Sequence, residues 1–185
     1  VFDENHPLSL QMLGMHGSYA ANHGIQNSDC IIAIGSRFDD RTTGNLDYYA
    51  PEAKKAFLER RGGIIHCNID NNEIKNVVDT NYNFCMDSKT FLKKINNGIK
   101  YSQRNEWLNK LNNWKLKYPF KYKKSNKLKT QEVLELLNKL IINKENYIFT
   151  TGVGNHQMWA CQFIKWSYPK NIISSGSLGV MGAGL

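Results

Sequence analysis

Hydrophobic and polar positions follow a strand-like and a helix-like pattern in turn along the first hundred residues. Three short apolar runs predict buried strands of the parallel type, at residues 30–35, 64–70 and 82–86. Four intervening or flanking segments are predicted as helices, at residues 18–27, 51–61, 71–79 and 89–99, the last with Asp87 and Ser88 at its N-cap. Strands that alternate with helices indicate a doubly wound α/β domain with a parallel sheet.

The same alternation resumes near residue 130. Trp107, Leu111 and Trp114 form one apolar face of a helix at 105–117, which we expect to pack in a core. A helix from residue 130, a strand at 147–150 and a helix at 155–166 then follow. The pattern predicts two partial Rossmann-like, three-layer domains: residues 1–100, a helix and basic linker at 101–129, and the start of a second domain at 130–185.

Charge and hydropathy narrow the function classes only slightly. The mean hydropathy is −0.50, and no apolar run approaches the length of a membrane span. The formal net charge of the chain is +8. Seven of the chain's lysines lie in one segment: Lys115, Lys117, Lys121, Lys123, Lys124, Lys127 and Lys129. A solvated linker is the favoured interpretation. A non-catalytic basic module that binds nucleic acid through this segment is the alternative from a different class.

The cysteines give no sign of metal binding. Cys30, Cys67, Cys85 and Cys161 are widely separated, and three of them fall within strand-like runs. They are expected to be reduced and buried small hydrophobic residues, and no metal site is predicted.

Two glycine-rich stretches near the end of the chain hold the first candidate chemistry. A strand passes through Gly152 and Gly154 into a helix, so its turn presents unpaired N–H groups at the positive end of a helix dipole. This arrangement favours a bound phosphate or diphosphate. The third glycine of the dinucleotide fingerprint is missing, so an ordinary strand-to-helix turn remains open.

Polar residues also follow the strands of the first domain. Arg37 and Arg41 come directly after the first strand, and Asn68 or Asp70 lies at the end of the second. Ligands of open α/β sheets bind beyond the carboxyl ends of strands, where arginine can meet a diphosphate and a polar residue can hold a ribose. A self-neutralising surface cluster is the alternative for the arginines and their neighbouring aspartates.

Several stretches resemble one known family. Gly-Val-Gly-Asn-His-Gln-Met-Trp-Ala at 152–160 and the glycine turn at 179–184 resemble the start of the diphosphate-binding domain of the acetohydroxyacid (acetolactate) synthase family. Residues 7–17 and 35–44, with Arg-Phe-Asp-Asp-Arg inside the latter, resemble its central, FAD-binding domain. The resemblance covers essentially the whole chain and thins only in the linker.

The resemblance implies two sets of cofactor contacts. The FAD contacts would be Leu13, Gly14, Met15, His16, Gly35, Ser36, Arg37, Phe38, Asp39, Ile69 and Asp87. The thiamine diphosphate contacts would be Val153, Gly154, Asn155, His156, Gly179 and Met181, the last as the apolar support under the bent coenzyme. Asn68 stands where the family usually has a carboxylate, and Asn155 where it commonly has glutamine.

The resemblance also implies the reaction. Thiamine diphosphate with Mg2+ would decarboxylate pyruvate and transfer the hydroxyethyl group to a second 2-keto acid, with FAD taking no redox part. The activating glutamate would precede residue 1 and the metal-holding motif would follow residue 185, so the catalytic residue is unknown here. The 185 residues alone are expected to be an inactive fragment.

Partners and location are further implications of the resemblance. A homo-oligomer with its active site at a subunit interface is expected, together with a possible regulatory small subunit and no membrane. An organelle, mitochondrion or plastid, is expected if the source is eukaryotic, and the cytoplasm otherwise. Another thiamine-diphosphate carboligase, oxidase or decarboxylase on the same scaffold is the closest alternative.

Overall fold

The computed structural model describes residues 2–141, 144–176 and 178–184. Its contacts divide the chain into two compact units. Unit 2 consists of residues 20–113, and unit 1 consists of residues 1–19 together with residues 114–185.

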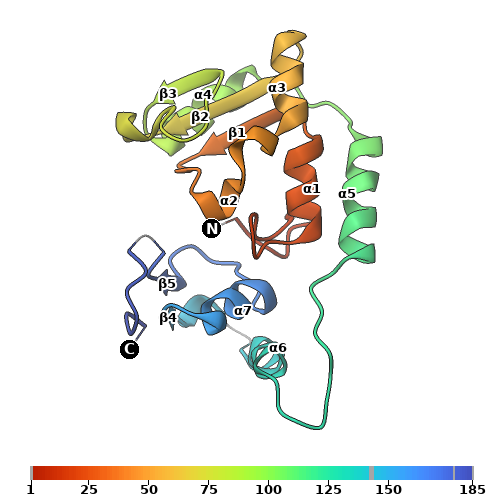
Figure 1. The fold of residues 1–185 in the computed structure, drawn as a ribbon, viewed down its shortest axis with the longest axis vertical. Coiled ribbons are helices and arrows are strands. Elements are labelled where there is room, and N and C mark those ends of the chain that lie inside the picture. Colours follow the sequence, from red (N-terminus) through yellow and green to blue (C-terminus); the bar gives the residue numbers. More distant parts are fainter. Residues whose placement is uncertain (1, 142–143, 177, 185) are drawn as a thin grey trace. The chain divides into compact units, whose positions relative to one another are not determined.

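Unit 2 is built on three parallel strands in the order β1-β2-β3 (Figure 1). They are β1 (Cys30–Ile34), β2 (Gly63–Asn68) and β3 (Tyr82–Cys85), which confirms the three predicted strands. Ile34 pairs with Cys67, and Asn68 pairs with Cys85, so the carboxyl ends of the strands lie nearly level. The residues that follow each strand therefore gather along one edge of the sheet.

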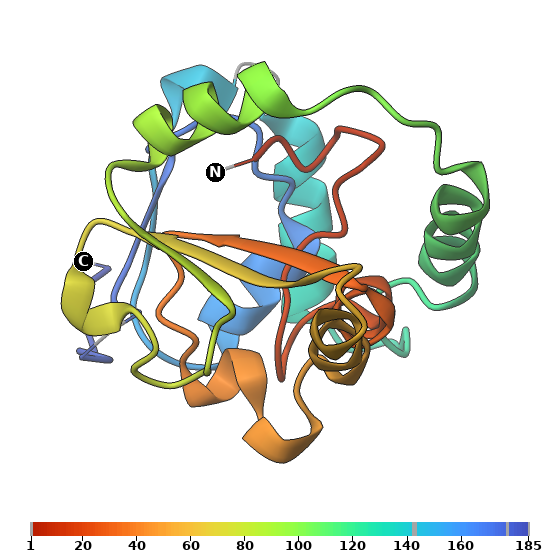
Figure 2. The same cartoon turned by 90° about the horizontal axis from the view of Figure 1, so that it is seen from above.

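Helices cover both faces of this sheet. The helical elements of unit 2 and its borders are α1 (Tyr19–Asn27), α2 (Asp40–Thr43), η1 (Leu46–Tyr48), α3 (Pro51–Leu58), η2 (Asn71–Glu73), α4 (Ser88–Gly98) and α5 (Asn105–Lys117). Figure 2 shows α4 on one side of the strands and α1 and α3 on the other. The predicted α/β class with parallel sheets is confirmed.

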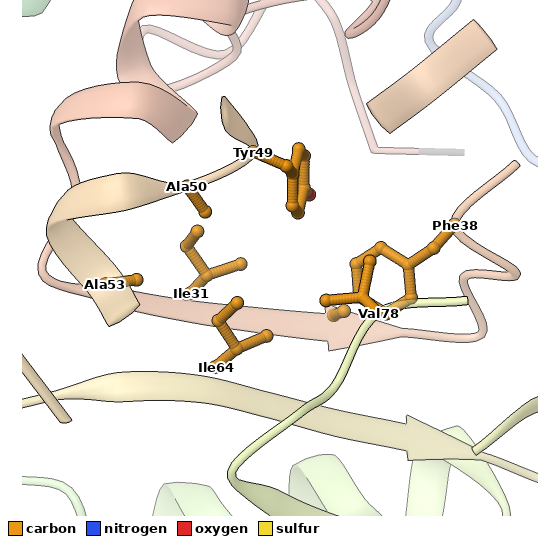
Figure 3. Close-up of a cluster of buried hydrophobic side chains, with 8 residues drawn as sticks. Ile31, Phe38, Tyr49, Ala50, Ala53, Ile64 and Val78 are labelled. Atoms are coloured by element: carbon orange, nitrogen blue, oxygen red, sulfur yellow. The ribbon is translucent and has the colours of Figure 1, made fainter. Parts of the chain in front are cut away.

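The core of unit 2 lies between the sheet and α3 (Figure 3). Ala50 and Ala53 are fully buried against Ile31 and Ile64, because small side chains let the helix approach the strands closely. Phe38, from the turn after β1, lies at one end of this cluster and is 3% exposed. The turn is thus tied to the core by a large side chain.

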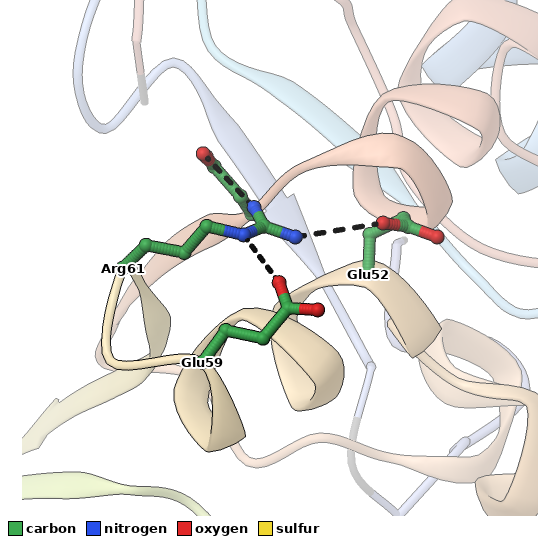
Figure 4. A network of polar contacts seen from close by, with 4 residues as sticks. Glu52, Glu59 and Arg61 are labelled. Atoms are coloured by element: carbon green, nitrogen blue, oxygen red, sulfur yellow. Dashed lines mark hydrogen bonds and ion pairs between the residues drawn. The ribbon is translucent and has the colours of Figure 1, made fainter.

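An exposed ion-pair network holds the connection from α3 to β2. Arg61 Nε lies 2.6 Å from Glu59 Oε2, and its other nitrogens lie 3.5 Å from Asp29 and 4.0 Å from Glu52 (Figure 4). Surface pairs of this kind contribute little stability. The backbone bond from Gly63 N to Asp29 O, 2.8 Å, fixes the start of β2 more directly.

Two predictions for unit 2 are wrong. The helix expected at 71–79 is only the short turn η2, because Lys75 adopts a φ of 60°, which helical residues avoid. The cysteines are not all buried either: Cys67 is, but Cys30 and Cys85 are exposed. The side chain of Cys30 lies on the same side of β1 as Ile32 and Ile34, which are 42% and 37% exposed.

In its described residues, unit 1 has a parallel pair of strands that packs with α-helices. Its elements are α6 (Thr130–Leu140), η3 (Lys144–Asn146), β4 (Phe149–Thr151), α7 (Asn155–Phe163) and β5 (Ile172–Ser174), of which β5 was not predicted. Ala160, Ile164 and Trp166 form its small core. The predicted helices at 105–117 and from residue 130 are confirmed, although neither contains a buried residue.

The N-terminal segment belongs to unit 1 through specific bonds. Glu4 N donates to Trp166 O at 2.9 Å, and Asn5 Nδ2 donates to Ser167 Oγ at 2.6 Å. Lys115 Nζ donates to Pro7 O at 2.8 Å. Within the described ranges, no helix is long and apolar enough to cross a membrane.

Candidate functional site

The first candidate region is the edge of the unit 2 sheet where the strands end. Gly35–Asp39, called the β1 turn from here on, follows β1, while Ile69 follows β2 and Asp87 lies two residues beyond β3. Gly35 N donates to Cys67 O at 2.8 Å, and Met86 N donates to Asn68 O at 3.0 Å. The structure therefore brings together the seven predicted flavin residues that lie in unit 2.

The β1 turn has a constrained backbone. Gly35 has a φ of 67° and Phe38 a φ of 54°, both in the left-handed region. Asp39 Oδ1 accepts from Thr42 N at 3.1 Å and so caps α2, while Arg37 is exposed. Because the Phe38 ring lies in the core, only its backbone can face a ligand.

The side chain of Asn68 is turned into the protein. It is 6% exposed; its Nδ2 donates to Ser36 O at 3.1 Å and its Oδ1 accepts from Asp70 N at 3.0 Å. These bonds do not agree with the expectation that Asn68 holds a ribose hydroxyl. Of the two candidates for that role, Asp70 is the exposed one, although its carboxylate already accepts from Asn72 N at 2.9 Å.

The other four predicted flavin residues lie in unit 1, within the segment Met12–Ser18, called the histidine loop. Ser18 N donates to Met12 O at 2.8 Å, and Gly17 N donates to Gly14 O at 2.9 Å. A β-carbon at Gly17 would lie 2.5 Å from Met12 O, so the turn admits only glycine there. Leu13 and His16 are half-buried, Gly14 is buried and Met15 is 72% exposed.

A contact that the sequence did not reveal joins this loop to α7. Gln162 Nε2 donates to His16 O at 2.9 Å, across 146 positions of sequence. Gln162 carries no motif, so no signal in the sequence singled it out. The helix α7, which begins after the glycine turn at residues 152–154, therefore also supports the histidine loop.

The second candidate region is the turn from β4 into α7. Gly154 is the N-cap residue, with a φ of 145° and no side-chain cap. Val153 and Gly154 form the turn, and Asn155 and His156 open the helix with exposed side chains. The backbone N–H groups of the first helical turn and the helix dipole make this end favourable for an anion.

The second glycine turn, residues 179–184, lies against the first. A β-carbon at Gly184 would lie 2.5 Å from Gly152 N, and Thr150 Oγ1 donates to Gly184 O at 2.6 Å. Gly179 has a φ of 64°, and Met181 is 80% exposed beside it. The structure thus brings together the six predicted thiamine diphosphate residues in one part of unit 1.

Ser174 at the end of β5 ties this region to the sheet. Thr151 Oγ1 donates to Ser174 Oγ at 2.8 Å, and Gln157 Nε2 donates to the same oxygen at 2.6 Å. Sequence reasoning missed Ser174 and Gln157 as supporting residues, because β5 itself was not predicted. Both strand ends are therefore fixed relative to the start of α7.

Two of the four thiols do not add a reactive group. Burial raises the pKa of Cys67 and of Cys161, so both are neutral thiols near pH 7. Burial also lowers the pKa of Lys165, just after α7. Among residues 2–141, 144–176 and 178–184, no group of three His, Cys, Asp or Glu side chains could hold a metal ion.

Comparison with known proteins covers both units. Residues 1–95 match the model "Thiamine pyrophosphate enzyme, central domain", and residues 152–185 match "Thiamine pyrophosphate enzyme, C-terminal TPP binding domain". The mitochondrial acetolactate synthase catalytic subunit of Saccharomyces cerevisiae is 46% identical over 100% of this chain. The mitochondrial acetolactate synthase of Schizosaccharomyces pombe is 44% identical over 99% of it.

A plant relative extends the same similarity. Chloroplastic acetolactate synthase 2 of Brassica napus is 39% identical over 98% of the chain. The chain spans 28% of the length of each of these three relatives. With a family model matched over just over half of its residues, the chain belongs to the thiamine pyrophosphate enzymes and is homologous over its whole length to acetolactate synthase catalytic subunits.

Proposed function

We propose that the polypeptide that carries these residues makes acetolactate or acetohydroxybutyrate by joining pyruvate to a second 2-keto acid. This is the first common step in the biosynthesis of valine, leucine and isoleucine. Similarity to acetolactate synthases along the whole chain supports the proposal. The observation that carries it is the contact between two glycine turns at the uncapped start of α7.

The residues around this contact suit thiamine diphosphate. The backbone of Gly154, Asn155 and His156 would bind the diphosphate at the helix N-terminus, and Val153 would line the turn. Gly179 and Met181 would lie against the aminopyrimidine, where a flexible thioether can fill the space below a bent coenzyme. When bound, the cofactor supplies the carbon nucleophile that reacts with a 2-keto acid.

The strand-end edge of unit 2 suits the diphosphate and ribityl part of FAD. Gly35, Ser36 and Arg37 would contact it, with Asp39, Ile69 and Asp87 around it and Phe38 contributing backbone only. The left-handed glycine lets the chain come close to a ligand, and the exposed arginine supplies positive charge. The histidine loop, with Leu13, Gly14, Met15 and His16, would line the flavin ring.

Two components of the reaction would come from other parts of the polypeptide. Mg2+ would neutralise the diphosphate, and a glutamate would activate the aminopyrimidine; neither a metal cluster nor an assigned catalytic residue lies among the described residues. On the family resemblance, residues 1–185 alone are expected to be inactive. The sequence pattern and the family resemblance support the assignment of residues 1–100 to the flavin-type domain, 101–129 to a linker and 130–185 to the start of the coenzyme domain.

Partners and location follow from the same family membership. We expect a homo-oligomer whose active site lies at a subunit interface, possible association with a regulatory subunit, and no role for nucleic acid. Relatives named as mitochondrial or chloroplastic favour an organelle in a eukaryotic source.

Product analysis tests the function. The whole polypeptide is incubated with pyruvate, thiamine diphosphate, Mg2+ and FAD, and the products are identified by nuclear magnetic resonance. Acetolactate is expected, together with release of carbon dioxide. Acetaldehyde or an oxidised acetyl product without acetolactate would instead indicate a decarboxylase or an oxidase on the same scaffold and would overturn the proposal.

A further inference from the structure

One backbone carbonyl in the β1 turn receives two hydrogen bonds from buried side chains. Ser36 O accepts from Asn68 Nδ2 at 3.1 Å and lies 2.8 Å from His66 Nε2. Because a carbonyl oxygen only accepts, the imidazole must carry its proton on Nε2. Both side chains come from alternate positions of β2 and so point to the same face of the sheet.

The two donors are held in place by their surroundings. His66 is 0% exposed, and the Phe38 ring packs edge-on to it at 4.9 Å between centroids. Asn68 Oδ1 accepts from Asp70 N at 3.0 Å, which fixes the orientation of the amide and aims its nitrogen at Ser36. The donors are thus positioned by the core and by β2, independently of any ligand.

This pair of bonds determines how the β1 turn presents its backbone. In a planar trans peptide the C=O and the N–H point in opposite directions, and no cis peptide occurs among the described residues. Since Ser36 O points towards β2, the N–H of the next residue, Arg37, points away from β2. Rotation of that peptide would break both bonds and leave a buried histidine and a buried amide without their acceptor.

We propose that His66 and Asn68 are positioning residues that hold the peptide between Ser36 and Arg37 ready for the diphosphate of FAD. The inference rests on the proposed flavin role of the β1 turn. In it, Asn68 acts through the turn and does not touch the ribose. A backbone already fixed in the binding geometry loses less entropy when the ligand binds, which raises affinity.

The test replaces Asn68 by its isostere. In the whole polypeptide, Asn68→Asp places a carboxylate oxygen against Ser36 O in place of the amide donor. The family usually has a carboxylate at this position, but in this chain the amide of Asn68 donates to Ser36 O. Loss of that buried bond and repulsion between the two oxygens should therefore weaken FAD binding by about tenfold or more, measured by flavin fluorescence titration. Asn109→Asp adds the same charge at an exposed position of α5 and should leave the affinity unchanged.

Two further readouts separate positioning from a general loss of stability. Hydrogen exchange of the amides of residues 35–38, without FAD, should accelerate in Asn68→Asp while the β2 amides stay protected. The effects of Asn68→Asp and Arg37→Ala on FAD affinity should be less than additive, because both act on the same turn. If Asn68→Asp does not fold, Asn68→Ser, which is neutral and too short to reach Ser36 O, takes its place.

The outcomes distinguish this inference from the proposed function. If the unmodified polypeptide does not bind FAD, the flavin role itself is wrong. If it binds FAD and Asn68→Asp binds equally well, or if exchange in the turn is unchanged, the positioning role is wrong while the flavin role stands. Additive effects with Arg37→Ala would likewise contradict it.

Discussion

The two candidate regions differ in how the backbone of their turns is held in place. In unit 2, buried side chains of β2 hold the β1 turn, through two bonds to one carbonyl. In unit 1, two glycine turns lie backbone against backbone, and a β-carbon at Gly184 would come within 2.5 Å of Gly152 N. The first region depends mainly on bonds that buried side chains donate, and the second depends mainly on glycines that let two backbone segments approach closely.

This difference predicts which changes each region tolerates. The β1 turn should tolerate modest changes of volume, but should be sensitive to the loss of a donor at β2. The glycine turns should be most sensitive to a single added carbon where the two backbones meet. The predictions below test this contrast, from the largest expected effect to the smallest.

Gly184→Ala should have the largest effect. The new methyl group would meet the backbone of Thr151 and Gly152, which cannot move without disturbing the start of α7. We expect thiamine diphosphate affinity, measured by calorimetry in the presence of Mg2+, to fall by about a hundredfold. Gly176→Ala is the matched control, because a β-carbon there meets nothing within 4 Å; equal loss in both variants would refute the steric argument.

Because of Tyr49, the stability of unit 2 should depend on pH in the alkaline range. Burial raises the pKa of this phenol to about 12 from an unfolded value near 10.0, so its contribution to stability is complete below pH 10 and is lost as the pH rises through 12. That contribution is on the order of 2 kcal/mol. Tyr49→Phe should flatten the fall in urea midpoint between pH 10 and 12, which are the limits set by these pKa values.

An exposed tyrosine provides the comparison for that experiment. Tyr101 is 89% exposed, and Tyr101→Phe should leave the pH profile as it is in the unmodified protein. A profile that is the same for Tyr49→Phe and Tyr101→Phe would show that burial of Tyr49 does not set the alkaline limit.

Gln162→Leu should have the smallest effect. It removes the bond to His16 O but keeps the approximate volume, at a cost of about 1 kcal/mol. FAD affinity should fall by about fivefold, while thiamine diphosphate affinity stays within about twofold. Gln103→Leu, at an exposed site, should change neither; a larger loss for the coenzyme than for the flavin would mean that Gln162 mainly supports α7.

The parallel strands could be predicted from the sequence because their apolar runs are short and bounded by glycine and polar residues. The prediction of a helix at 71–79 was wrong. The composition of this segment permits a helix, but the left-handed backbone at Lys75 depends on the surrounding structure. Strand β5 was missed since Ile172 and Ile173 are too few to give a period.

The candidate residues could be located by resemblance, but their orientations could not. The sequence places Phe38 in a predicted ligand-binding stretch, yet its ring belongs to the core. The sequence also predicts Asn68 as a ribose ligand, yet its amide faces Ser36. Both orientations result from packing between the β1 turn and β2. Asn68 and Ser36, for example, are 32 positions apart in the sequence. Such pairings leave no local signal.

The most direct test of the account measures both cofactor affinities in the same three proteins: the unmodified whole polypeptide, Gly184→Ala and Asn68→Asp. We expect Gly184→Ala to lose thiamine diphosphate and keep FAD, and Asn68→Asp to lose FAD and keep thiamine diphosphate. Parallel loss of both cofactors in either variant, or full retention of both, would contradict the assignment of the two regions to two different ligands.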